Sequence, residues 1–231
     1  MTRPDEPPND RQMTYPPAFS GQSLLRVSAA FVALVGWAAL MLQLVLTVSL
    51  VLGQGRSLTM ALVIYFGFFT ILTNLLATLV VSAWCVGPAF PGHRGLRRPT
   101  TLTTAASAIT IVGLVYFFIL RHTWKPEGAQ FLADAVLHYV MPVLVVLFWA
   151  AAVPVRAVRW SSAPWLLLYP LLYLVYVFAR GEVTGLYPYE FIDVLKIGYA
   201  AALRNSVGLM AVYAGITATY VAAKNSTRSE N

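Results

Sequence analysis

The chain has 231 residues, of which 58% are hydrophobic and 11% charged, with a formal net charge of +7 and a single cysteine, Cys85. So little charge cannot cover the surface of a soluble domain of this size. One cysteine excludes an internal disulfide and a multi-cysteine metal site. The basic residues lie in short segments beside apolar runs, which indicates membrane topology and not a nucleic-acid partner.

Six apolar runs are long enough to cross the hydrocarbon core of a bilayer. They cover roughly residues 25–52, 58–87, 101–120, 130–153, 164–180 and 196–222. The alternating pattern of an outer-membrane barrel is absent. The sequence therefore predicts an all-α fold, a polytopic membrane bundle of six transmembrane helices within residues 23–223. Residues 1–22 are predicted to be a disordered cytoplasmic tail, and residues 224–231 a short cytoplasmic tail.

The orientation in the membrane follows from the distribution of positive charge. The N-terminal segment, the loops after the second and fourth spans, and the C-terminal segment carry most of the lysine and arginine. These residues are Arg3, Arg11, Arg26, Arg94, Arg97, Arg98, Arg156, Arg159, Lys224 and Arg228. The richer side is normally cytoplasmic. We therefore expect a multi-pass protein of the plasma membrane with both termini in the cytoplasm.

The second span contains three polar residues, Thr70, Thr73 and Asn74, in the stretch FFTILTNLL. Spacings of three and four put them on one face of a helix. Such residues commonly serve packing and hydrogen bonding between membrane helices. A functional role for this face remains open beside that structural one.

The fourth span begins FLADAVLHYVMP, with Asp134 and His138 four residues apart. A carboxylate at that spacing can orient an imidazole and stabilise its charged form. A charged group inside a span costs roughly 3 kcal/mol on insertion scales, so residues of this kind often face the bundle interior and serve function. Pro142, one turn later, frees a backbone carbonyl.

The loop before the sixth span reads ARGEVTGLYPYEFIDV and predicts a structured, amphipathic cap at the membrane surface. Glu182, Tyr187 and Tyr189 are candidates there for ligand binding or ion pairing. Tyrosine is also enriched at membrane interfaces simply as an anchor, so both interpretations stay open.

Arg204 and Asn205 lie inside the sixth span. Arg204 is expected to pair with Asp134 or with an acid of the preceding loop, or to bind an anionic head group. The second, fourth and sixth spans all enter from the outer side. At 1.5 Å rise per residue, Thr70, His138 and Arg204 then belong to one layer between the outer leaflet and the midplane.

These residues resemble the androgen-induced-gene family of six-span membrane proteins and its bacterial relatives. FFTIL around Thr70 is similar to that family's aromatic–hydrophobic–Thr element, and LHYVMP around His138 to its His–hydrophobic–Pro element. The segment from Tyr173 through GEVTGLYPYEFID resembles the region after the family's fifth span. Animal members hydrolyse fatty acid esters of hydroxy fatty acids with an intramembrane threonine nucleophile and a histidine.

The resemblance implies a lipid ester hydrolase acting on a membrane lipid. Thr70 would be the nucleophile, with Thr73 as the alternative, and His138 would take the hydroxyl proton. Asp134 would orient His138, and Asn74 would donate to the developing oxyanion. No cofactor or metal is implied.

The motifs of other enzyme classes are missing from the sequence. It contains no G-x-S-x-G elbow, Walker loop, dinucleotide fingerprint or HExxH. His93 and His122 are expected on opposite sides of the membrane, so the three histidines do not predict a metal site. A non-catalytic lipid- or ligand-binding protein, or a small transporter using Asp134, His138 and Arg204, remains the alternative.

Overall fold

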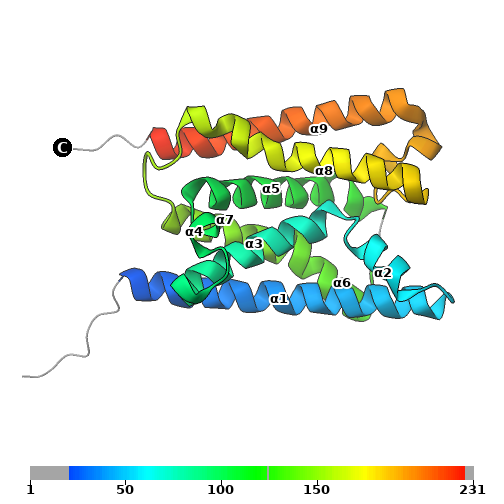
Figure 1. Cartoon of the computed structure of the whole chain (residues 1–231), viewed down its shortest axis with the longest axis horizontal. Helices are drawn as coiled ribbons and strands as arrows, with labels where there is room; N and C mark the ends of the chain where they lie inside the picture. The colour runs from blue at the N-terminus through cyan, green and yellow to red at the C-terminus, as the bar shows by residue number, and fades with distance from the viewer. Residues whose placement is uncertain (1–20, 124, 227–231) are drawn as a thin grey trace, which may run out of the picture.

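The computed structural model describes residues 21–123 and 125–226. In this part of the chain, six helices are long and apolar enough to cross a membrane, which confirms the all-α six-span bundle and identifies an integral membrane protein (Figure 1). Most of the predicted tails lies outside the described residues. Residues 21 and 22 already belong to the first helix, and residues 224 and 225 to the last.

Each span has bounds close to its apolar run. The helices are α1 (Gly21–Gly53), α2 (Leu58–Tyr65) with α3 (Phe69–Val86), α5 (Pro99–Phe118), α6 (Gly128–Ala135) with α7 (Met141–Ala152), α8 (Ala163–Thr184) and α9 (Val194–Asn225). A short helix α4 (His93–Leu96) and 3₁₀ turns at Gly87–Ala89, Leu120–His122, Trp160–Ser162 and Glu190–Ile192 lie in the connections.

The bundle is organised around α3, α5 and α7. Helix α1 packs on α3, α6 and α7 along one flank, and α8 and α9 cover α5 along the other (Figure 1). The largest group of buried apolar side chains joins these central helices to both flanks. The first residues of α1 and the last of α9 lie at the same end of the bundle (Figure 1), as six crossings require.

The second span is broken, where the sequence predicted one continuous helix over 58–87. Helix α2 ends at Tyr65, and α3 begins at Phe69 after an extended Phe68. A break inside a bilayer leaves carbonyls without helical partners, and these need other donors. Three side chains of α8 supply them: Arg180 Nη1 to Val63 O at 2.6 Å, Tyr176 to Phe66 O at 3.2 Å and Tyr173 to Gly67 O at 3.0 Å.

The fourth span is also irregular, because one turn of π-helix, η3 (Val136–Val140), joins α6 to α7. Pro142 offers no N–H to the carbonyls of this turn. The Asn74 amide of α3 donates to one of them, Leu137 O, at 3.2 Å. π turns within α-helices often occur at functional sites, and this one carries His138.

Candidate active site

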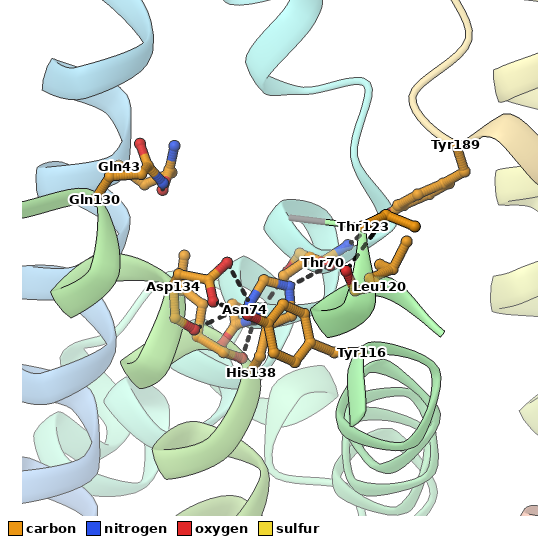
Figure 2. A network of polar contacts seen from close by, with 11 residues as sticks. Gln43, Thr70, Asn74, Tyr116, Leu120, Thr123, Gln130, Asp134, His138 and Tyr189 are labelled. Atoms are coloured by element: carbon orange, nitrogen blue, oxygen red, sulfur yellow. Dashed lines mark hydrogen bonds and ion pairs between the residues drawn. The ribbon is translucent and has the colours of Figure 1, made fainter. Parts of the chain in front are cut away.

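Thr70, His138 and Asp134 form a chain of polar contacts between two spans (Figure 2). The Thr70 hydroxyl lies 3.4 Å from His138 Nε2. His138 Nδ1 lies 3.3 Å from Asp134 Oδ1 and 3.0 Å from the Asp134 carbonyl. With the Nδ1 proton directed at Asp134, Nε2 is free to accept the Thr70 proton, so the three groups have the order of a nucleophile, a base and an orienting acid.

Tyr116 of α5 completes the surroundings of His138. Its hydroxyl donates to Asp134 Oδ2, so both carboxylate oxygens of Asp134 have partners. Its ring stacks on the imidazole with 4.1 Å between ring centroids and 19° between planes. The imidazole is therefore held by a hydrogen bond at one edge and by an aromatic ring on one face.

The break before α3 determines where Thr70 lies. Thr70 is in the first turn of α3, where backbone N–H groups have no partner within the helix. Its N–H donates to the hydroxyl of Tyr189 at 3.4 Å, which reaches Thr70 from the loop between α8 and α9 (Figure 2). Burial raises the pKa of Tyr189, so this phenol keeps its proton and remains a donor at neutral pH.

Asn74 and Thr73 have contacts other than those expected of catalytic groups. The Asn74 amide nitrogen donates to Thr70 O at 2.9 Å as well as to Leu137 O, and the residue is fully buried. Both amide protons are thus used in joining α3 to η3, and neither is available for an oxyanion. Thr73 is fully buried and lies 3.1 Å from the Tyr169 hydroxyl, whereas Thr70 is the threonine that contacts His138.

Two cavities adjoin Thr70. The large cavity has a volume of about 500 Å³, and its lining includes Gln43, Tyr65, Tyr116, Gln130, Asp134 and His138. The small cavity has a volume of about 80 Å³, and its lining includes Phe69, Ile111, Val115, Pro170, Met210 and Tyr213. Thr70, Leu120 and Tyr189 line both cavities. Thr70 therefore lies between the two cavities, and the large one also contains His138 and Asp134.

Glu182 and Tyr187 belong to a separate cluster at the C-terminal end of α8. Tyr187 donates to Glu182 at 3.0 Å, and Tyr199 of α9 donates to the same carboxylate. Burial, and then the bond to Glu182, raise the pKa of Tyr187 to about 12. Neither residue lines a cavity at Thr70, so this cluster joins α8 to α9 and stays apart from the site.

In the described chain, Arg204 pairs neither with Asp134 nor with an acid of the preceding loop, and its binding to an anionic head group stays a prediction. Asp134 contacts His138 and Tyr116 instead, and Arg204 is exposed on α9 and forms no ion pair or hydrogen bond within the described chain. Arg204 lines neither cavity. Its neighbour Asn205 donates to Phe191 O at 2.9 Å, which ties α9 to the preceding loop. A combined Asp–His–Arg site is therefore not formed.

Three residues near the site were not identified from the sequence. Tyr116 is one of several aromatics near the end of its span, and Gln43 and Gln130 lie in apolar helices without a motif. Gln130 donates to Gln43 at 2.8 Å, and both residues line the large cavity (Figure 2). The available signal was the presence of a glutamine in each of two apolar runs. An amide without a hydrogen-bond partner is costly in a membrane, so each glutamine indicates a partner on another helix.

Comparison with known proteins found no match to this chain among family models, curated proteins or solved structures. The likeness to the androgen-induced-gene family stays a prediction. Support for a function therefore comes from the contacts among Thr70, His138 and Asp134.

Proposed function

We propose that this membrane protein is an intramembrane lipid ester hydrolase with Thr70 as its nucleophile. The observation that carries the proposal is the contact of Thr70 Oγ1 with His138 Nε2 at 3.4 Å, with Asp134 on the other ring nitrogen. Catalytic hydrogen bonds are often somewhat long before substrate binds. The resemblance to threonine hydrolases points to the same two residues.

The reaction proceeds in two steps with a balanced proton transfer. Thr70 Oγ attacks the ester carbonyl while His138 Nε2 takes its proton. The imidazolium then returns this proton to the alcohol oxygen as the C–O bond breaks, which leaves an acyl-threonine. Water attacks the acyl group, His138 takes one of its protons, and that proton goes back to Thr70 as the acid leaves.

The proposed donors to the oxyanion are the Tyr189 hydroxyl and the backbone N–H groups of the first turn of α3. A helix N-terminus stabilises negative charge through its free N–H groups and its dipole. Because Asn74 is already committed to two carbonyls, it has a positioning role in this proposal: it holds Thr70 and η3 at a fixed separation.

The proposed setting is the plasma membrane, with both termini in the cytoplasm and a membrane lipid as substrate. The excess of arginine and lysine at the end that holds both termini supports this orientation. The site then opens towards the outer half of the bilayer, where water for the second step is close.

A fluorophosphonate probe tests the proposal on the purified full chain. We expect the probe to label the wild type, and Thr70→Val and His138→Ala to abolish labelling. Thr73→Val is the matched control, since it removes a hydroxyl from the same helix face one turn away, and it should still be labelled. A wild-type protein that neither labels nor cleaves any lipid ester would contradict the proposal and favour a binding or transport role.

A further inference from the structure

One wall of the large cavity carries uncharged polar side chains that have no role in the proposed attack on the ester. They come from α1, from the connection that follows it and from the first turn of α6, and they are Gln43, Thr47, Gln54 and Gln130. Both steps of a hydrolysis need a nucleophile, and the second one needs water beside His138. The inference that follows rests on the proposed hydrolase function.

Helical spacing and hydrogen bonds place these side chains in a row that leads to the imidazole. The Gln43 amide donates to the Thr47 hydroxyl one turn later on α1 at 3.3 Å, and Gln130 donates to Gln43 at 2.8 Å. Gln130, Asp134 and His138 follow one another at intervals of four in the fourth span, so they share one helix face. The glutamine pair lies on the Asp134 side of the site (Figure 2).

The row also reaches the polar end of α1. Gln54 follows Gly53, the last residue of this helix, and is exposed in the connection GQGRS over residues 53–57. Gln43, Thr47 and Gln130 are partly buried, and Asp134 is buried. The polar wall therefore extends from an exposed loop to the buried acid of the site.

The glutamine pair has hydrogen-bonding groups left for a bound molecule. Each glutamine donates once within the chain from an amide that has two N–H groups, and the Gln130 side-chain carbonyl accepts no hydrogen bond from the described residues. Polar groups without partners are costly inside a membrane. A bound water makes roughly two to four hydrogen bonds to such groups, so this wall suits water.

The small cavity has no comparable wall. Its Tyr173 and Tyr213 hydroxyls already donate to backbone carbonyls. Apart from these two residues, Thr70 and Tyr189, its described lining is apolar. Water for the second step therefore arrives through the large cavity.

We propose that Gln43, Thr47 and Gln130 bind the water that hydrolyses the acyl-threonine, on its way from the exposed connection to His138. In that step the water oxygen bonds to the acyl carbon while His138 Nε2 takes one water proton. The bond between the acyl carbon and Thr70 Oγ then breaks, and the proton passes to Thr70 Oγ. The three residues are positioning residues for water, so they act on deacylation and leave acylation unchanged.

The double variant Gln43→Leu/Gln130→Leu tests this route on the full chain in nanodiscs. Replacing both partners of a hydrogen bond by apolar side chains of similar size leaves no amide unpaired, so the fold should be retained. The enzyme is acylated with a 4-methylumbelliferyl ester, and loss of the acyl group in a single turnover is followed by rapid quenching and intact mass spectrometry. We expect the rate constant for this loss to fall about tenfold and kcat/KM to stay within about twofold, because kcat/KM reports acylation.

Two substitutions of Thr47 separate its hydroxyl from its packing. Thr47→Val keeps the shape and removes the hydroxyl, so it should also slow deacylation, whereas Thr47→Ser should keep the wild-type rate. Ser49→Val is the matched control, since Ser49 is an exposed residue of α1 that lines neither cavity. Fluorophosphonate labelling at the wild-type rate verifies that the acylation site of each variant is intact.

Three results would count against these assignments. A double variant that loses its acyl group at the wild-type rate would overturn the water route and leave the hydrolase function standing. A double variant whose labelling and kcat/KM fall as much as its deacylation would also overturn the route, because that pattern indicates a general loss of packing. Failure of the wild type to label or to cleave any ester would refute the hydrolase function itself.

Discussion

Tyr189 is the residue at which the loop before α9 reaches the site. Its hydroxyl accepts a hydrogen bond from Thr70 N–H at 3.4 Å, so its own proton is available to a substrate oxygen. Removing one donor from an oxyanion site typically lowers kcat by about a hundredfold or more. We expect Tyr189→Phe to lower kcat by about that factor with little change in KM, measured with the fluorogenic ester that the wild type cleaves fastest.

Tyr187→Phe is the control for this variant. It removes a phenol two residues away in the same loop, one that bonds to Glu182 and lines neither cavity, and kcat should stay within about twofold. A Tyr189→Phe enzyme with wild-type kcat would exclude the phenol from the oxyanion site.

The site residues that the sequence could identify are those linked by local spacing. Asp134 and His138 are four apart on one helix, so their contact follows from helical geometry alone. The roles of Tyr116 and Asn74 depend on how α5 and α3 pack against the fourth span, and no local pattern encodes that. Because the sequence does not give this packing, it predicted Asn74 as an oxyanion donor. In the structure, the Asn74 amide instead donates to Thr70 O and Leu137 O.

At the scale of the element, the break between α2 and α3 is the feature on which the site depends. The Arg180 guanidinium fills the space beside Gly67, where a Cβ atom would overlap its Nη1. Gly67→Ala should displace Arg180 from Val63 O and Leu186 O, to which it donates at 2.6 Å in each case. Losing hydrogen bonds from a charged donor costs about 2 kcal/mol or more.

We therefore expect Gly67→Ala to lower both the stability and the rate of fluorophosphonate labelling. Stability is measured as the fraction of protein that stays soluble and monodisperse after heating in detergent, by size-exclusion chromatography. Gly208→Ala is the control, because a Cβ there meets no atom within 4 Å, and it should be neutral or slightly stabilising. Unchanged stability and labelling in Gly67→Ala would show that Arg180 is not required at the break.

The break was not predictable from the apolar run at 58–87, and the reason is physical. Hydropathy reports whether a segment is apolar, and this segment is apolar throughout. A non-helical turn inside it is possible only because Tyr173, Tyr176 and Arg180 of α8, more than a hundred residues later, satisfy its carbonyls. The number of spans, in contrast, follows from run length alone and was predicted correctly.

At the scale of the whole molecule, both ends of the described chain lie at one end of the bundle (Figure 1). The positive charge of that end predicts that it is cytoplasmic. In a Cys85→Ala background, we expect Glu190→Cys to react with a membrane-impermeant maleimide in intact cells. Ser226→Cys should react only after permeabilisation. The reverse pattern would invert the orientation.

The donors that hold the break at Gly67 come from α8, and Tyr189 follows α8 in the chain. A nascent chain that has inserted only four spans contains Thr70, Asp134 and His138, yet lacks the groups that hold the start of α3 in place. Such a chain has no assembled oxyanion site. Under the proposed hydrolase function, a partly inserted chain is therefore inert towards the lipids around it, and activity begins only when synthesis is nearly finished.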